Sequence, residues 1–529
     1  MHFDRSDLQQ LTPEYVRDLS SQRKDTLVEQ LRKDLMNAQD RLNQNSSNSS
    51  RPPSSQFPWN RSTNPDNDES AQEGDPAKTP EELKGDGQPI GNGTSLEDLS
   101  KPTNENKEKP VKGKKKKPGK QRGAQGFGRT QKLEVTHEVI HRPKCCKGCH
   151  CEFSLENGFK ATNGHYTIDL KLPALGVIGV HGTYTKHIYG SIECTCGFKT
   201  TTSPHRVPGD SGWVVDMGEW RLIGPTLLAF LVFLKLRMHM TLSKSSELLY
   251  LWMGIKLSEG CINKALREAG RAASSFEPEI IAALKASGLI QMDETPWKEH
   301  KVTRWFWIAI VDNVVYYTVG PRTLEVAKRI LEGFKGTLMT DGLAVYRWYQ
   351  DRLRCWSHLD RKAVGLEESW DKEASTFGAY AVNVFESLRQ SIYKMREMEP
   401  SQRTSEQEFC EEIRFNFVYE CLKRNDVQHE ATRAFAIEIL NDKEVIFRQL
   451  KEPDFPLTNN ASERSLRSKV ILRNMCHGSK TEEGSKSITS LSSLIDTLCL
   501  RKSEVWSFLA ATISKCRSGQ PPPPMPSPA

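Results

Sequence analysis

The spacing of apolar residues near the N-terminus predicts a helix within residues 1–45. Five apolar positions follow alternating steps of three and four, the a/d pattern of a coiled coil, and charged or amide side chains fill most of the gaps. So few heptads leave two interpretations open, a coiled coil with a second copy and a short amphipathic helix that packs on its own chain. The five positions are Val28, Leu31, Leu35, Ala38 and Leu42.

Residues 46–130 contain few apolar side chains and are rich in Asn, Ser, Pro, Gly, Asp, Glu and Lys. Such a segment buries too little apolar surface to offset chain entropy, so we expect a disordered linker. Within it, residues 101–130 carry nine Lys and two Arg against two Glu, a net charge of +9, whereas the whole chain has +7. A tract this basic predicts an arm that contacts phosphates, with a solvated, nonspecific tail as the alternative.

Residues 131–205 alternate apolar and polar positions as β-strands do, for example at Tyr166, Ile168 and Leu170. The block also holds six of the chain's 13 cysteines. The first 40 residues are charged throughout and show no signal peptide, so metal binding explains the cysteines better than disulfides do.

Two cysteine pairs that flank a short β module suit a tetrahedral zinc ion, and so small a module has too little core to fold without one. The first pair has C-x-x-C spacing and the second has C-x-C spacing. Cys145 and Cys151 are alternative ligands, and a degraded site with free thiols is the competing interpretation. The predicted ligands are Cys146, Cys149, Cys194 and Cys196.

Helical periodicity returns in residues 206–284. Residues 241–252 and 258–273 predict two helices, with Gly254 in the turn between them and Ser258 as an N-cap. This is helix-turn-helix spacing, but any helical hairpin produces it. The longest apolar run, residues 222–234, is too short to cross a bilayer and predicts a buried helix, so we expect no membrane partner.

The pattern in residues 285–361 predicts the order β-β-β-α-β-α-β, which is the ribonuclease-H-like order. Strands are expected at residues 289–293, 304–311, 314–319, 336–340 and 353–356, and helices at 323–334 and from 344. We therefore predict a multidomain α/β protein with a ribonuclease-H-like catalytic core over residues 285–475. A C-terminal helical segment and a disordered proline-rich tail complete the chain over residues 476–529.

Acidic residues stand at two defined points of this core. Asp293 ends the first strand and Asp341 follows the fourth, and the two strands are neighbours if the third lies at the sheet edge. Glu294 follows Asp293 directly and on a strand must point to the opposite face, so we assign it a supporting role.

A third acid is expected from a later helix. Asn459 or Asn460 can cap a helix that carries Glu463 in its first turns. A helical insertion, at about residues 367–450, must then fold back to bring Glu463 to the other two acids. Three carboxylates of this kind suit a pair of Mg²⁺ or Mn²⁺ ions, which cleave phosphodiesters by activating a nucleophile and stabilising the leaving oxygen.

The chain as a whole resembles the transposases of the IS66 insertion-sequence family. Its motifs resemble that family's basic Gly-Gln element, zinc module, first and second Asp motifs, Trp-x-His-x-x-Arg element and Asn-Asn-x-x-Glu-Arg motif. Ala124 stands where a histidine is usual, and the second cysteine pair is one residue shorter than usual. The motifs lie at residues 117–123, 141–149 with 194–197, 292–297, 340–342, 355–362 and 459–464.

The resemblance implies hydrolytic nicking at transposon ends, followed by strand transfer of the 3′-hydroxyl into target DNA. It places His358 and Arg361 near the active site, where they contact DNA phosphate or order the acids, with a structural His–carboxylate pair as the alternative. It also implies a homo-oligomer in the prokaryotic cytoplasm, associated with the nucleoid, and small accessory proteins from the same element.

We expect DNA contacts from the basic arm and from two arginines beside Glu463. Two other functions remain as alternatives: an inactive, zinc-containing DNA-binding regulator, and a ribonuclease-H-like nuclease that needs no inverted repeats. The predicted DNA-binding residues are Lys114, Lys115, Lys116, Lys117, Lys120, Arg122, Arg464 and Arg467.

Overall fold

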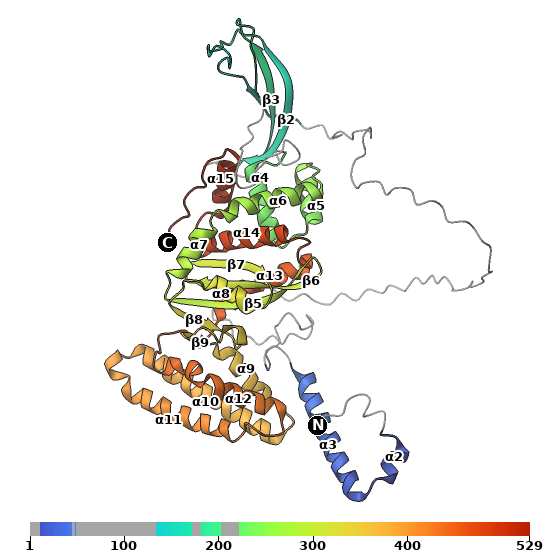
Figure 1. The fold of residues 1–529 in the computed structure, drawn as a ribbon, viewed down its shortest axis with the longest axis vertical. Helices are drawn as coiled ribbons and strands as arrows, with labels where there is room; N and C mark the ends of the chain where they lie inside the picture. The colour runs from blue at the N-terminus through green and yellow to red at the C-terminus, as the bar shows by residue number, and fades with distance from the viewer. Residues whose placement is uncertain (1–10, 45–47, 49–133, 172–180, 203–221, 529) are drawn as a thin grey trace, which may run out of the picture. The chain divides into compact units, whose positions relative to one another are not determined.

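A computed structural model describes residues 11–44, 48, 134–171, 181–202 and 222–528 of the chain (Figure 1). The predicted basic arm, Lys114 to Lys117, Lys120 and Arg122, lies outside the described residues.

A five-stranded mixed sheet forms the centre of the larger folded part. Its order is β7-β6-β5-β8-β9, with antiparallel pairing from β7 to β5 and parallel pairing from β5 to β9. The prediction that the first and fourth strands are neighbours is confirmed, because the third strand does lie at the edge. The strands are β5 (Leu289–Glu299), β6 (Val302–Val311), β7 (Val314–Gly320), β8 (Thr337–Thr340) and β9 (Arg352–Arg354).

The helices between these strands are shorter than their periodicity predicts. α8 (Leu324–Ile330) ends before Gly333, which has a φ of 77°, and the segment after Asp341 forms only a 3-10 turn, η5 (Ala344–Tyr346). The 3-10 turn η5 connects the neighbouring strands β8 and β9, so this connection is too short for a full helix, whereas α8 connects the edge strand β7 to β8 across the sheet.

The edge strand β7 is covered by α14 (Glu482–Leu500), which runs beside it in Figure 1. The Ser493 and Thr497 hydroxyls accept hydrogen bonds from the outward N–H groups of Tyr317 and Val315, at 2.9 and 3.1 Å. A strand edge that would otherwise offer free N–H groups to another chain is thus satisfied within the protein.

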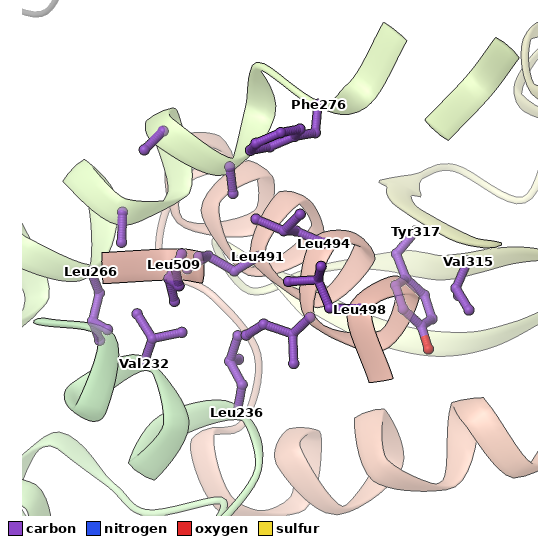
Figure 2. Close-up of a cluster of buried hydrophobic side chains, with 14 of the residues drawn as sticks. Val232, Leu236, Leu266, Phe276, Val315, Tyr317, Leu491, Leu494, Leu498 and Leu509 are labelled. Carbon is purple, nitrogen blue, oxygen red and sulfur yellow. The ribbon is translucent and has the colours of Figure 1, made fainter. Parts of the chain in front are cut away.

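Leucines of α14 also make the main hydrophobic core. Figure 2 shows Leu491, Leu494 and Leu498 pointing between the sheet and a layer of helices. The sheet and these helices therefore share one continuous core. The helices of this layer are α4 (Pro225–Leu236), α5 (Leu242–Met253), α6 (Glu259–Ser274), α7 (Glu277–Lys285) and α15 (Val505–Arg517).

The helix-turn-helix-like pair is formed by α5 and α6, with Ser258 as the side-chain cap of α6 and Gly254 in the left-handed region. One face of α6 packs in the helical layer, where a Cβ at Gly270 would lie 2.5 Å from Ser487 of α14. Asn263 and Lys264 are exposed on the opposite face, so DNA contact by this helix-turn-helix-like pair stays a prediction.

The helical insertion forms a second core beyond β9. Aromatic rings stack and pack edge to face there, among them Trp356, Phe385 and Phe417. As predicted, its helices lie largely between residues 367 and 450. They are α9 (Trp356–Glu367), α10 (Lys372–Glu397), α11 (Thr404–Leu422) and α12 (Glu430–Ile446).

Buried ion pairs join the insertion to the sheet. Arg354 of β9 is fully buried and pairs with Asp442 and Glu438 of α12, and Arg352 pairs with Asp442 at 2.8 Å. Removing either partner of such a pair leaves a buried charge without compensation, so this junction resists movement.

The cysteine-containing module is a separate small sheet whose base enters the main core. Ile168 exchanges backbone hydrogen bonds with the segment before α4, and the Asp169 carboxylate accepts the Leu227 N–H at 2.8 Å. Asp169 therefore satisfies a free N–H at the start of α4. The strands are β1 (His137–His141), β2 (Phe159–Lys171), β3 (His181–Glu193) and β4 (Lys199–Thr201), in the order β1-β3-β2 with β4 on β3.

The two ends of the chain differ from each other. The predicted N-terminal helix is present as α3 (Ser21–Asn43), preceded by the short α2 (Pro13–Asp18), and Val28, Leu35 and Leu42 of its apolar stripe are 65%, 60% and 83% exposed. At the C-terminus, Met525 is buried and Arg501 donates to the Pro526 carbonyl at 2.6 Å. The tail expected to be disordered is thus ordered through residue 528, because proline carbonyls and one methionine find partners on the core. No helix in the described part of the chain combines the length and apolar character needed to cross a membrane.

Candidate active site and candidate metal centre

Asp293 lies on β5, on the face that α13 (Asn460–Cys476) covers. Its Oδ1 accepts the Glu294 backbone N–H at 2.8 Å. Burial raises the pKa of Asp293 well above its ordinary value, and the charges of Glu294, Asp341 and Glu463 raise it further. The charges of Asp341 and Glu463 thus both reach Asp293, but among the described residues the three acids do not form a group whose ligand atoms all lie within 4.8 Å of one another.

Asp341 directly follows β8. Its Oδ1 accepts the Leu343 N–H at 2.9 Å, which closes the turn before η5. Gly342 is required here, because a Cβ would lie 2.3–2.6 Å from the guanidinium of the buried Arg354. The position of Asp341 is thus fixed by the same arginine that anchors the helical insertion.

Glu463 lies in the first turn of α13, as predicted. Its Oε1 is 3.4 Å from Arg361 Nη2 and 3.8 Å from His358 Nδ1, both on α9. The predicted residues His358 and Arg361 therefore contact an acid of the site. Lys362, Arg361 and Arg354 surround His358 with positive charge, and burial together with those charges lowers the pKa of His358 to about 3.

Asn459 occupies the N-cap position of α13, but its side chain makes no capping hydrogen bond. The expectation that it caps the helix is corrected: its Nδ2 instead donates to the Met292 carbonyl at 2.8 Å, and the residue is fully buried. Its backbone N–H donates to Cys355 Sγ at 3.2 Å. Asn459 thus holds the start of α13 to β5, one residue from Asp293.

Glu294 points to the other face of the sheet, as the strand alternation predicts. It accepts hydrogen bonds from Tyr346 Oη at 2.7 Å and from Arg322 Nη2 at 2.7 Å, and Arg322 stacks over Trp305. Burial and the charge of Asp341 raise the pKa of Glu294 to about 7. Glu294 thereby ties β5 to the segments that follow β7 and Asp341.

The second cluster consists of the four predicted cysteines. Their sulfurs all lie within 4.8 Å of one another, with Cys146 to Cys196 at 3.6 Å and Cys149 to Cys194 at 3.5 Å. Zinc–sulfur bonds of about 2.3 Å at tetrahedral angles place sulfurs about 3.8 Å apart, so the spacing fits. Cys145 and Cys151, the alternative ligands, are exposed and stand outside this group.

Backbone turns position these thiols. The Gly197 N–H donates to the Cys194 carbonyl at 2.8 Å, and Gly197 has a φ of 80°, so the short C-x-C pair still closes a tight turn. Hydrogen bonds from the backbone N–H groups of Cys149 and Gly148 lower the pKa of Cys146 to about 6, against the opposing effect of burial. Although the Phe198 N–H has the opposite effect, the neighbouring thiols raise the pKa of Cys196 to about 12. The thiols of Cys146 and Cys196 thus interact with each other, which fits side chains close enough to bind one ion.

Arg464 and Arg467 are exposed on α13 beside Glu463. Within the described residues neither forms an ion pair, so both guanidinium groups face solvent without a protein partner. Cys355 was not predicted as part of any site, yet its thiol lies within 4.8 Å of His358 and Glu463 ligand atoms. Its C-x-x-H spacing with His358 is the signal in the sequence that points to it.

Comparison with known proteins gives a family and one relative. Residues 221–487 match the model of a family described as "Transposase IS66 family". The uncharacterized protein y4qI of Sinorhizobium fredii is 22% identical over 306 residues, which cover 52% of this chain and 56% of the relative. The chain thus aligns with about half the length of that relative.

Proposed function

The chain belongs to the IS66 family of transposases, and from that premise we propose that it cuts the DNA ends of an insertion sequence and joins the 3′ ends to target DNA. Asp293, Asp341 and Glu463 are the proposed catalytic carboxylates. The observation that carries the proposal is the joint effect of Asp341 and Glu463 on the pKa of Asp293, although residues 341 and 463 are 122 positions apart.

The donor set fits Mg²⁺ or Mn²⁺. All three groups are carboxylates, which these hard ions prefer, and a dication would relieve the mutual repulsion that disfavours ionised Asp293. When bound, a pair of such ions activates the attacking water or 3′-hydroxyl and stabilises the leaving oxygen. The strand order β7-β6-β5-β8-β9, with the acids beside β5 and β8, supports a ribonuclease-H-like core.

The remaining groups of the site position the acids. Asn459 holds α13 against β5, and the ion pair between Lys469 and Asp496, at 2.8 Å, fixes α13 to α14. Arg361 contacts the Glu463 carboxylate from the other side at 3.4 Å, and His358 lies 3.8 Å from it. Pre-set carboxylates lose little entropy when metal and phosphate bind, which favours catalysis.

We further propose that Cys146, Cys149, Cys194 and Cys196 hold a structural zinc ion and that the module helps to bind terminal inverted repeats. A closed site of four thiolates leaves no coordination position for a substrate, which supports a structural role. Double-stranded DNA is bound by exposed cations that lack protein partners, and a homo-oligomer forms through the apolar stripe of α3, which is exposed in the described structure. The proposed DNA-binding residues are Lys114, Lys115, Lys116, Lys117, Lys120, Arg122, Arg464 and Arg467.

Cleavage of duplexes that carry the element's own ends tests the proposal. With Mg²⁺, the native chain is expected to nick at the ends and then join them to a target plasmid, whereas Glu463→Gln removes one carboxylate and abolishes both steps. Glu482→Gln is the matched control, because Glu482 is 74% exposed and pairs only with Lys486 at the surface.

Two outcomes would contradict this function. If native protein binds the ends but never cuts them, the chain is a DNA-binding regulator. If it cuts hybrid RNA–DNA duplexes in preference to the element's ends, it is a nuclease on the same fold. Undiminished cleavage by Glu463→Gln would refute the role of Glu463 in either case.

A further inference from the structure

Three side chains of different chemistry meet beside the proposed active site. Cys355 precedes α9, His358 lies one turn into that helix, and Glu463 reaches them from α13. One ligand atom from each lies within 4.8 Å of the other two. Two of the three, Cys355 and His358, have no part in holding the hard ions proposed above.

The three ligand atoms lie close to one another, although Glu463 Oε1 is also 3.4 Å from Arg361 Nη2. His358 Nδ1 is buried and has no hydrogen-bond partner among the described residues, which costs free energy unless something binds it. Cys355 is fully buried, which raises the pKa of its thiol to about 11, and the Asn459 N–H, which donates to Sγ at 3.2 Å, acts in the opposite direction. Glu463 Oε1 lies 3.8 Å from the unpartnered nitrogen.

The donor set selects a particular class of metal. Thiolate, imidazole and carboxylate together suit Zn²⁺, with bonds of about 2.0–2.3 Å, whereas Mg²⁺ avoids sulfur and nitrogen. Bonds of that length place nitrogen and oxygen ligands about 3.3 Å apart, so the observed 3.8 Å requires a closure of only a few tenths of an ångström.

The local charge permits such an ion. Lys362 and Arg354 are compensated by Glu438, at 2.6 Å from Lys362 and 2.5 Å from Arg354. Arg361 alone remains to oppose a cation, and a thiolate with a carboxylate would balance the two charges of zinc.

We propose that Cys355, His358 and Glu463 form a second zinc site, distinct from the four-cysteine centre, and that its occupation inhibits DNA cleavage. On binding, the Cys355 thiol gives its proton to solvent and a zinc–sulfur bond forms, with no change of oxidation state. Glu463 then serves zinc instead of the magnesium ions. The inhibition, but not the metal site itself, rests on the proposed function.

Cobalt uptake by the full chain tests the site without using activity. The native protein is expected to bind two Co²⁺ ions, one with the strong charge-transfer absorption of four thiolates and one with weaker absorption from a single thiolate. Cys355→Ser should lose the second ion, weakening its affinity by about 100-fold or more, since it removes a direct ligand. Cys499→Ser, which changes an exposed thiol elsewhere, should keep both ions.

His358→Gln provides a second variant in case Cys355→Ser does not fold. It should lose the same ion while the four-cysteine centre and Cys355 stay intact. Equal cobalt stoichiometry and identical spectra for native protein, Cys355→Ser and His358→Gln would overturn the proposal. So would a second site that disappears in Cys149→Ser, because it would then belong to the four-cysteine module.

Cleavage assays show whether this inference or the proposed function has failed. With saturating Mg²⁺, added Zn²⁺ should slow cleavage by native protein, and Cys355→Ser should resist that inhibition relative to its own zinc-free rate. If Glu463→Gln stops cleavage but leaves cobalt uptake unchanged, the proposed function stands and this site is refuted. If Glu463→Gln loses the second cobalt yet still cleaves, the site stands and the role of Glu463 in catalysis is refuted.

Discussion

The cluster of acids and the cluster of four cysteines are assembled in opposite ways. The predicted acids Asp293, Asp341 and Glu463 belong to strand and helix segments that share a large apolar core. The cysteines come from two short turns, residues 146–149 and 194–197, on a small sheet with only its base in that core. The predicted acids thus rest on a large core, whereas we expect a metal ion to stabilise the cysteine turns.

Metal removal should show the largest difference between the two regions. Chelation, or Cys149→Ser, is expected to unfold the cysteine turns, because structural zinc contributes up to about 10 kcal/mol to modules of this kind. Limited proteolysis should then cut near residues 141–160 and 193–201, while thermal unfolding of the main core changes little. Equal protection of these turns with and without chelator would show that the module folds by itself.

Asp293→Asn should have the next largest effect, with a loss of activity and a gain of stability. Loss of one carboxylate is expected to lower the cleavage rate by on the order of 10³-fold or more, comparable to the loss of other electrostatic groups in active sites. Because the pKa of Asp293 is raised, its ionised form destabilises the fold, so Asn should raise the unfolding temperature above pH 7. Asp426→Asn, at an exposed turn of the insertion, serves as the control and should change neither quantity.

The raised pKa of Glu294 predicts that the stability of the fold depends on pH. Its pKa rises from 4.5 to about 7, so the folded state binds an extra proton between those values and stability falls as pH rises through that range. The upper bound of the effect is about 3 kcal/mol. Glu294→Gln should flatten the slope in urea unfolding measured from pH 5 to pH 8, and an unchanged slope would assign it to other groups.

The two asparagines of the Asn-Asn pair should differ. Asn459→Ala leaves the buried Met292 carbonyl without its donor and frees the start of α13, so cleavage should fall by about 10–100-fold at unchanged affinity for DNA. Asn460→Ala, at the exposed neighbour, should stay within about twofold. A kcat loss shared equally by both variants would remove the special role of Asn459.

The smallest effect is expected at Arg467, on the exposed side of α13. Arg467→Ala should weaken binding to all duplexes by a similar factor and reduce the slope of log affinity against log salt by about 1. Ile471→Ala, at another exposed position one turn on, is the control and should leave the slope unchanged.

The sequence predicts local features of this molecule better than its contacts. Strand alternation placed Asp293 and Glu294 on opposite faces, because it depends on neighbours in sequence. The burial of α6 was hidden, since its hydrophobic stripe says only that one face packs and its small residues, such as Gly270, allow a second.

Polar contacts between distant segments could not be predicted from the sequence either. Asn459 has the residue type of an N-cap, yet it bonds to a strand 167 positions away. Nothing local distinguishes a capping asparagine from one whose amide reaches another element. The cluster of Cys355, His358 and Glu463 could not be predicted for the same reason, because only the fold brings α9 and α13 together.

The most direct test of the central claim, that three distant acids surround the same ions, is metal-directed cleavage of the protein. Fe²⁺ in place of Mg²⁺, with ascorbate and peroxide, produces hydroxyl radicals that cut the backbone beside the bound ion. The account predicts cuts near residues 293, 341 and 463 in the same protein, all suppressed by excess Mg²⁺. Cuts near 293 and 341 with none near 463 would contradict it.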